Sequence, residues 1–418
     1  MRVVSCPSEA AAVRSPHCIH DAAAPAGMPI SDLDPFAPDF LAEPHAGHAA
    51  LRDLGPVVWL ARYNIAAVAR HAEVREVLRD WESFSSARGV GMEDLERHDR
   101  LRLPSVILET DPPLHTASRG VLAKALAPAR MKLFAEEVAS KADAVLDAAL
   151  TRGDICGVAD LAEALPLAVF PDLIGIPQQG RAKLLPHADM MFNSFGPRNA
   201  LFAASLAGAA HDWVEELGKL EHLAPGSLGA EIHRIAGERG YDPAEAGKLV
   251  RALLQAGLDT TVNGLAAALL CLSDAPGQWE RLRAEPDLAG AAFDEAVRLE
   301  SPVQTFFRTA AREVELGGFR LEPGTKVLMF LGAANRDPRR FDDPDTYLIG
   351  RNAADHVGFG TGIHHCIGRP LAKLEAETLL RRLAVRVARI EPLGPPERRL
   401  NNTVRGLASL PLRLVPAA

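Results

Sequence analysis

One cysteine in a glycine-rich loop constrains this chain more than any other feature. Cys366 lies within residues 359–368, which read Phe-Gly-Thr-Gly-Ile-His-His-Cys-Ile-Gly. The glycines allow the backbone to fold tightly around one sulfur, so that peptide N–H groups point at it. Pro370 suits the first turn of a helix, and Leu379 and Leu383 continue an apolar four-residue spacing behind it. We therefore expect a thiolate at the positive end of a helix, with a lowered pKa, presented to a metal.

Two other interpretations of this loop are weaker. The cysteine would be an ordinary buried residue in a structural turn, or a zinc ligand. The zinc interpretation is the poorer one, because His364, His365 and Cys366 are adjacent and lack the two-to-four-residue spacing of zinc ligands. The sequence also has no Cys-x-x-Cys pair to complete such a site.

Composition limits the partners of the chain. Its 418 residues are 48% hydrophobic, enough for a large core, and its net charge is −8, from 46 basic and 54 acidic residues. That balance argues against binding to bulk nucleic acid or to anionic membranes, and favours small molecules or proteins as partners. We identify no apolar stretch of the length that spans a bilayer.

The cysteines and the N-terminus bear on the cellular compartment. Five cysteines are scattered and odd in number, which does not indicate a disulfide framework and favours reducing cytoplasm. The first segment is rich in alanine and has no apolar core of a secretory signal. We expect residues 1–28 to form a disordered extension, with a transit peptide as the alternative, and residues 29–418 to form one domain.

The remaining pattern predicts a mainly α single domain with a smaller β region. A hairpin is expected over residues 57–69, followed by a helix over 71–80. Helical periodicity dominates residues 115–300, and the prolines within it are expected to separate helices. A second β segment is expected over 313–320, turning at Pro323-Gly324 into 326–330.

A second chemical motif lies in an apolar helical stretch that runs to about Leu272. There Gly257 is followed by Asp259 and Thr260. An acid and an alcohol are unusual in an apolar helix. Gly257 weakens the helix locally and Thr260 can bond to a carbonyl one turn back, so we expect a kink with room for a small ligand and water.

Together these motifs resemble those of the cytochrome P-450 family, haem-thiolate monooxygenases with a mainly helical fold. The resemblance implies haem b, with Cys366 as axial ligand to the iron and with Phe359, Gly360 and Gly368 around the cofactor. Asp259 and Thr260 match the family's oxygen-activation motif. In that role Asp259 would feed protons from solvent and Thr260 would hold water in position.

Further residues are assigned by their position relative to the family's motifs. The two haem propionates need cationic partners, which the resemblance places at four positions: His115, Arg119, Arg308 and His364. Glu295 and Arg298 match a buried pair that organises the core, and we assign them a structural role.

Three segments narrow the resemblance further. Residues 103–109, 192–197 and 301–308 resemble the bacterial members that oxidise para-substituted benzoic acids, and the likeness runs from about residue 30 to the C-terminus. The substrate-binding residues that this match implies are Arg102, Ser105, Phe192, Phe195, Gln255, Ala256, Phe306 and Val404. The phenylalanines would wall a flat pocket, with Arg102 and Ser105 at the carboxylate end.

One departure from that subfamily concerns the distal helix. Members carry small hydroxyl residues at the positions held here by Ala252 and Gln255. The change removes one expected carboxylate donor. Gln255 would either supply an amide N–H instead or, through its bulk, change which acid fits.

The sequence thus predicts a cytoplasmic monooxygenase that uses O2 to hydroxylate or O-demethylate a small aromatic carboxylic acid. The chain has neither a flavin domain nor a cysteine cluster, so an iron–sulfur ferredoxin and its reductase are expected as partners. A set of basic residues would offer them a docking face: Lys124, Arg130, Lys132, Arg369 and Lys373. The alternatives are a peroxygenase that uses hydrogen peroxide directly, and a haem-based sensor or carrier without catalytic activity.

Overall fold

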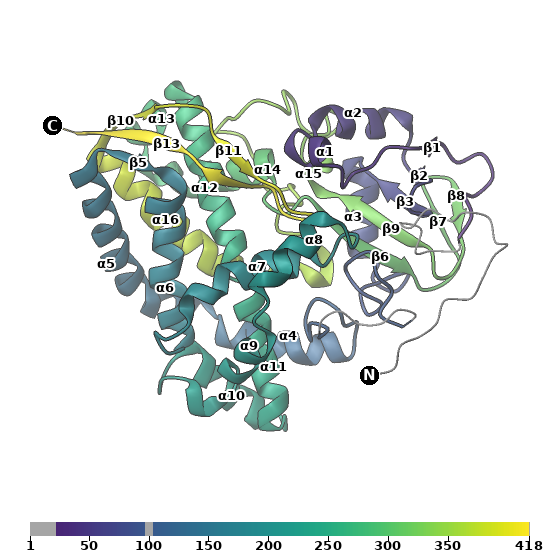
Figure 1. Ribbon diagram of the computed structural model, residues 1–418, viewed down its shortest axis with the longest axis horizontal. Coiled ribbons are helices and arrows are strands. Elements are labelled where there is room, and N and C mark those ends of the chain that lie inside the picture. Colours follow the sequence, from purple (N-terminus) through teal and green to yellow (C-terminus); the bar gives the residue numbers. More distant parts are fainter. Residues whose placement is uncertain (1–21, 97–102, 418) are drawn as a thin grey trace.

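The computed structural model describes residues 22–96 and 103–417, and Figure 1 shows their arrangement. Helices fill one side of the molecule and a sheet flanked by short helices fills the other. The first part of the predicted N-terminal extension, residues 1–21, lies outside the described residues, so that prediction stays a prediction. Residues 22–28 belong to the described chain, with Met28 buried and Ala22 and Ala24 packed against the core.

The main sheet has six strands in the order β1-β2-β3-β9-β6-β4. Its strands are β1 (Ile30–Ser31), β2 (Val58–Leu60), β3 (Ile65–Val68), β4 (Phe84–Ser85), β6 (Thr305–Ala310) and β9 (Lys326–Phe330). The predicted first hairpin is present as the antiparallel pair β2–β3. The second differs from the prediction. Strand β7 (Val314–Leu316) pairs with β8 (Phe319–Leu321), whereas β9 pairs with β3 and β6.

Smaller sheets complete the β region. Strands β5 (Asp154–Cys156), β10 (Val387–Pro392) and β13 (Pro411–Pro416) form one, and β11 (Glu397–Arg399) with β12 (Gly406–Ser409) forms another. The C-terminal strands thus return across the helical side of the molecule (Figure 1).

Helices make up most of the rest. The first group comprises α1 (Pro38–Ala42), α2 (His45–Leu54), α3 (His71–Arg79), α4 (Leu114–Ala125), α5 (Pro128–Arg152), α6 (Ala164–Ile174), α7 (Leu184–Asn193), α8 (Ala200–Ser205) and α9 (His211–Leu217). The second comprises α10 (Leu228–Glu238), α11 (Pro243–Ala256), α12 (Asp259–Asp274), α13 (Pro276–Ala284), α14 (Ala289–Glu300), α15 (Leu331–Ala334) and α16 (Arg369–Arg386). Short turns of 3-10 or π-helix link several of them.

The expectation that prolines separate the helices is only partly right. Pro166 and Pro186 lie in the first turns of α6 and α7, where the missing N–H has no intrahelical partner. Pro171 lies inside α6. Pro177 and Pro197 are the two that fall between helices.

The buried helices α11 and α12 follow one another as a long apolar run through the centre. By length and composition alone, Pro243–Asp274 is able to cross a membrane, so the expectation that no stretch has that length is wrong. Of its most apolar window, 83% is buried inside the protein, as in a core helix. The run is interrupted at Gly257 and Leu258, between α11 and α12, where a kink was expected.

An ion pair within α14 ties this core to the segment before the cysteine loop. The carboxylate of Glu295 accepts two hydrogen bonds from Arg298, at 2.7 and 2.8 Å, and both side chains are fully buried. Arg298 also donates to the carbonyl groups of Asn335 and Pro344. Arg351 donates to Glu295 at 3.0 Å, so this pair fixes the chain that leads to Cys366.

Candidate active site

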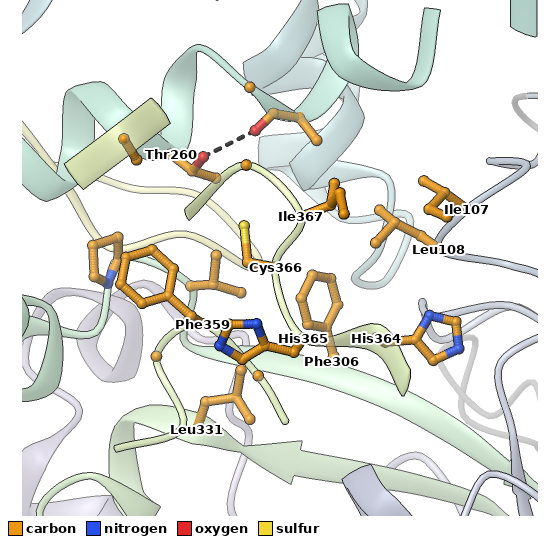
Figure 2. Close-up of a pocket in the computed structure, with 18 of the residues that line it drawn as sticks. Ile107, Leu108, Thr260, Phe306, Leu331, Phe359, His364, His365, Cys366 and Ile367 are labelled. Atoms are coloured by element: carbon orange, nitrogen blue, oxygen red, sulfur yellow. Dashed lines mark hydrogen bonds between the residues drawn. The ribbon is translucent and has the colours of Figure 1, made fainter. Parts of the chain in front are cut away.

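A cavity lies between the cysteine loop, the α11–α12 junction and β6. It contains about 1390 Å³ of space free of protein atoms, part of it open to solvent. Figure 2 shows Cys366, Phe359 and Ile367 from the loop, Thr260 from α12 and Phe306 from β6 along its walls. The two motifs identified in the sequence therefore meet at one cavity.

The cysteine loop has the tight backbone that its glycines suggest. Gly360 and Gly362 have φ values of +66° and +69°, a left-handed region that favours glycine. A Cβ atom at Gly362 would also lie 2.7 Å from the carbonyl oxygen of Leu78. The N–H of Cys366 donates to the carbonyl of Phe359 at 2.8 Å, which closes the loop before α16 begins.

The helix behind the cysteine starts where it was predicted and ends slightly earlier than its apolar spacing suggested. Pro370 lies in the first turn of α16, and Leu379 and Leu383 are fully buried. Val387, the next apolar residue in the spacing, begins strand β10 instead. The sulfur of Cys366 therefore lies at the N-terminus of an 18-residue helix.

The sequence predicted a lowered pKa for the thiol of Cys366. The surrounding protein residues have the opposite net effect. Burial raises the pKa of the thiol, and this outweighs the N–H groups of Gly368 and Arg369 that hydrogen-bond to the sulfur. The donors are present as predicted, but removal of water from the sulfur has the larger effect. Charge on the sulfur then depends on a cation such as a metal ion.

The interruption between α11 and α12 lies beside the cavity. The hydroxyl of Thr260 donates to the carbonyl of Ala256 at 2.9 Å, and that of Thr261 donates to the carbonyl of Gly257 at 3.0 Å. The dashed line in Figure 2 marks the Thr260 bond. These residues line the cavity, as does Ala256. The predicted bond from Thr260 to a carbonyl one turn back is present.

Asp259 is fully buried and does not itself line the cavity. Its carboxylate accepts hydrogen bonds from Arg399 at 2.6 Å and from Asn263 at 3.1 Å. Burial raises the pKa of Asp259, and the Arg399 guanidinium opposes the increase. Arg399 also lies 4.0 Å from Asp189, whose side chain is partly exposed. A chain of polar groups thus leads outward from Asp259.

The four predicted propionate partners gather at one end of the cavity. Arg119, Arg308 and His364 line it, and the rings of His115 and His364 are 4.3 Å apart. Within the described part of the chain, the buried Nε2 atoms of both histidines have no hydrogen-bond partner. Burial holds the pKa of each imidazole below its usual range and lowers the pKa of Arg308 to about 10.

This cluster fits an anionic group. Two arginines and the buried Nε2 atoms of two imidazoles converge on an interior space, where cations and donors need a counterpart. The carboxylates of haem would supply one, with Cys366 at the iron. Among the described residues no group of three or more His, Cys, Asp or Glu side chains is placed to hold a metal ion by itself. The donor set therefore fits haem.

Aromatic side chains from outside the cysteine loop form part of the cavity wall. Phe192 and Phe306 line the cavity. Phe195 lies behind them, with ring centroids 5.8 Å from Phe192 and 5.9 Å from Phe306. Val404 is buried and bridges by backbone to Val303, which does line the cavity. The segments 192–197, 301–308 and 401–404 therefore meet as predicted, with Phe195 and Val404 in a supporting layer.

Few of the residues that were expected to bind the substrate carboxylate line the cavity. Arg102 lies outside the described residues. Ser105 is buried, and its hydroxyl accepts hydrogen bonds from the N–H groups of Ile107 and Leu108, which line the cavity in its place. Ala252 lines the cavity, whereas Gln255 points away, with its Nε2 atom 3.9 Å from the sulfur of Met191.

Two arginines of this region were missed in the sequence. Arg399 reaches Asp259 from β11, 140 residues away along the chain. Arg251 is buried beside the 103–105 segment, where it donates to the carbonyl of Pro104 at 3.1 Å and to Glu215 at 2.6 Å. Neither arginine lies in a local motif, so only the apolar surroundings of Arg251 in α11 offered a signal.

Comparison with known proteins agrees with this geometry. The profile of the family described as Cytochrome P450 matches residues 232–408. The chain is 53% identical to cytochrome P450 CYP199A2 of Rhodopseudomonas palustris, over 94% of this chain and 96% of that protein. It is 29% identical to a beta-dihydromenaquinone-9 omega-hydroxylase of Mycobacterium tuberculosis, over 93% of this chain and 80% of that protein.

Solved structures show the same fold. Cytochrome P450 CYP109Q5 from Chondromyces apiculatus matches with a TM-score of 0.78 and 29% identity, covering 92% of this chain and 98% of that one. The mainly helical single-domain fold predicted from the sequence is therefore confirmed. The chain belongs to the cytochrome P450 family, as a monooxygenase whose cofactor is haem b.

Proposed function

We propose that this monooxygenase oxidises a small aromatic carboxylic acid at its para substituent, by O-demethylation or hydroxylation. The observation that carries the proposal is the apolar, aromatic lining of the cavity. Phe192 and Phe306 line it, and the ring of Phe195 packs edge-on against both. An apolar and aromatic lining of this kind suits an aromatic ligand.

Bound haem supplies the activation of O2 with electrons that arrive one at a time. The thiolate of Cys366 would hold its iron, and Phe359, Gly360 and Gly368 line the cavity beside the sulfur. His115, Arg119, Arg308 and His364 would hold the propionates. This assignment is supported by the buried Nε2 atoms of His115 and His364, which have no hydrogen-bond partner among the described residues.

Asp259 and Thr260 would deliver protons. Thr260 lies at the cavity wall, where its hydroxyl can hold a water molecule, and Asp259 lies directly before it in the same turn. The carboxylate is bound to Arg399, so transfer to the cavity requires that the carboxylate leave this partner. The partly exposed Asp189 beyond Arg399 gives the route a connection to solvent.

The substrate would lie with its carboxylate at the 102–108 segment and its para substituent toward Cys366. Ile107 and Leu108 line that end of the cavity, and Ser105 and Arg251 lie behind them. Orientation of the ring would fix the position oxidised, because only the para substituent reaches the haem. Ala256 would complete the pocket, and Val404 would support it through its backbone bridge to Val303.

A ferredoxin and its reductase would supply the electrons to a soluble, cytoplasmic enzyme. Four of the five basic residues proposed for docking are already paired with acids. Arg369 and Lys373 share Asp294, Lys124 pairs with Glu238 and Arg130 with Glu231. Their net positive field is therefore smaller than the sequence suggested, and docking would rest more on shape.

Titration with aromatic acids tests the substrate class. We expect 4-methoxybenzoic acid to shift the haem spin state and to be demethylated when NADH, a surrogate ferredoxin and its reductase are present. Its methyl ester and its meta isomer should bind more weakly. If neutral aromatics bind as tightly as the acids, the benzoate proposal is wrong. If hydrogen peroxide alone supports the same turnover, the ferredoxin is not required.

A further inference from the structure

A buried lysine donates hydrogen bonds to a loop that forms part of the cavity wall. Lys326 is on β9, paired with Thr309 of β6, and its side chain has 0% exposure. Its ammonium donates to three carbonyl groups, those of Arg88 at 3.2 Å, Gly89 at 2.9 Å and Gly91 at 3.0 Å. All three belong to residues 88–91, here called the 88–91 loop, which follows β4.

Charge on Lys326 suits this arrangement. Only the ammonium has three N–H groups for three carbonyl oxygens, since the neutral amine has two. Burial lowers the pKa of Lys326 to about 7, and Arg88 and Arg308 act in the same direction, whereas Asp94 and Glu109 oppose it. Fully buried lysines are rare unless their charge is compensated. Here each N–H group of the ammonium has a backbone carbonyl as its partner.

The 88–91 loop contacts the substrate wall directly. Val90 lines the cavity. The carbonyl of Val90 accepts from the N–H of Phe307 at 2.9 Å, next to Phe306. A Cβ atom at Gly91 would lie 2.8 Å from the Cα atom of Phe195, so the two backbones are in close contact. The N–H of Met92 donates to the carbonyl of Phe195 at 2.7 Å.

Glu109 extends the same connection to the opposite end of the pocket. One oxygen of its buried carboxylate accepts from the N–H of Val90 at 3.2 Å, and the other accepts from the N–H of Ser105 at 3.0 Å. The loop held by Lys326 is thereby joined to the segment proposed for the carboxylate of the substrate. A displacement of this loop would move both ends of the pocket together.

We propose that Lys326 is a positioning residue, which sets the shape of the substrate pocket by holding the 88–91 loop through three carbonyl groups. Lys326 does not line the cavity. It acts on binding through Val90, Phe195 and Glu109. The proposal rests on the proposed function in one respect only, because it takes the same cavity as the substrate site.

The test compares Lys326→Met with Lys248→Met, a variant at an exposed lysine of α11. Methionine keeps most of the side-chain volume and removes the three donors. We expect both haem-loaded variants to keep the red-shifted Soret band of the reduced carbon monoxide complex. Lys326→Met should bind 4-phenylimidazole about tenfold more weakly than wild type, because charged hydrogen bonds that fix the wall are lost. Lys248→Met should match wild type.

Steady-state kinetics separate positioning from general damage. With 4-methoxybenzoic acid, KM should increase by about the same factor in Lys326→Met while kcat changes far less, and the preference for the para over the meta isomer should decrease. Unchanged affinity for 4-phenylimidazole with unchanged isomer preference overturns the proposal. So does a fall in kcat without a rise in KM.

A second variant covers the case in which Lys326→Met does not take up haem. Glu109→Gln keeps the shape of the side chain but places an amide N–H against the N–H of Val90 or Ser105, and it should weaken 4-phenylimidazole binding in the same direction. Wild-type affinity in this variant then overturns the proposal. Because 4-phenylimidazole requires only a haem iron and space for a phenyl ring, a failure of the benzoate proposal leaves this comparison intact.

Discussion

The two sides of the cavity are built differently. On the cysteine side, Phe359, Gly360, Cys366 and Gly368 come from ten consecutive residues, and the loop is closed by its own backbone bond between Cys366 and Phe359. On the substrate side, Val90, Leu108, Phe192 and Phe306 come from four separate segments of the chain. The first side is a local structure and the second is a tertiary one.

The difference bears on which property each side determines. The cysteine loop is closed by its own backbone bond and takes its donors to the sulfur from neighbouring residues, so a short motif is enough to identify the chemistry. The substrate wall depends on contacts such as Lys326 with the 88–91 loop, or Met92 with Phe195. Specificity can therefore change through residues that never touch the substrate, while the chemistry stays the same.

The largest effect is expected on the cysteine side. Cys366→Ser removes the thiolate and leaves the glycine loop and α16 in place. We expect complete loss of the red-shifted Soret band in the reduced carbon monoxide complex, and loss of product formation, with far-UV circular dichroism unchanged. A variant that keeps this band would contradict the assignment of Cys366. Cys271→Ser, at a buried cysteine outside the cavity lining, is the matched control.

A smaller effect is expected at the polar residues of the distal helix. Asp259→Asn keeps the volume and removes the acid, so the rate of product formation should fall about 10²–10³-fold. Asp274→Asn, at an exposed acid of the same helix, should have no such effect.

Thr260→Ala separates the two roles, because it should leave NADH consumption running while product per NADH falls and hydrogen peroxide appears. Equal coupling in Thr260→Ala and wild type would exclude the proposed role of Thr260. These variants extend the comparison of local and long-range structure. Asp259 and Thr260 are adjacent in sequence, yet the carboxylate of Asp259 is held by the distant Arg399.

The same contrast explains what the sequence predicts. The start of α16, the bond from Thr260 to Ala256 and the buried Glu295–Arg298 pair all involve residues a few positions apart, and all were predicted. The fold class followed from the helical and strand periodicity of the sequence, in agreement with the family resemblance.

Long-range features were harder to predict. Arg399 reaches Asp259 across 140 residues, and β9 pairs with β3 rather than extending the nearby β7–β8 hairpin. The pKa of Cys366 was predicted in the wrong direction because burial depends on the whole fold and the motif shows only the donors. The orientation of Gln255 toward Met191 likewise depends on α7, which its own helix does not reveal.

The cysteine side also contains a buried acid, and the local motif does not reveal how its hydrogen bonds are made. Glu375 lies on the buried face of α16 with 1% exposure, and its Oε2 atom has no hydrogen-bond partner among the described residues. Burial raises its pKa to about 8 in the folded state, from 4.5. As the pH increases between these values, the unfolded chain loses its proton first, so the free energy of unfolding decreases.

We therefore expect Glu375→Gln to be more stable than wild type near pH 8, by about 1–3 kcal/mol. The gain should shrink toward pH 5, close to the ordinary pKa of 4.5, where the unfolded chain of the wild type begins to hold the proton as well. Thermal unfolding of the haem-loaded protein at the two pH values measures this, with Glu377→Gln on the same helix as control. A gain of equal size at both values would show that ionisation of Glu375 is not the cause.

The smallest expected effect lies on the substrate side, at Ala252. This residue lines the cavity from α11, at a position where the family resemblance noted in the sequence implies a small hydroxyl residue. Gln255 does not replace that donor, because its Nε2 atom faces the sulfur of Met191 rather than the cavity. A hydroxyl at 252 should therefore add a hydrogen bond to the substrate carboxylate that the native protein lacks.

Ala252→Ser should strengthen the binding of 4-methoxybenzoic acid by about 0.5–1.5 kcal/mol, a two- to tenfold decrease in Kd. Its methyl ester, which has no charged oxygen, should bind as it does to wild type. Spin-state titration of the haem measures both constants. If acid and ester gain equally, the added hydroxyl acts by filling space. If neither gains, the carboxylate lies elsewhere and the proposed orientation of the ring must be reversed. A gain confined to the acid would show that one local substitution adjusts a wall whose position is otherwise set by distant segments.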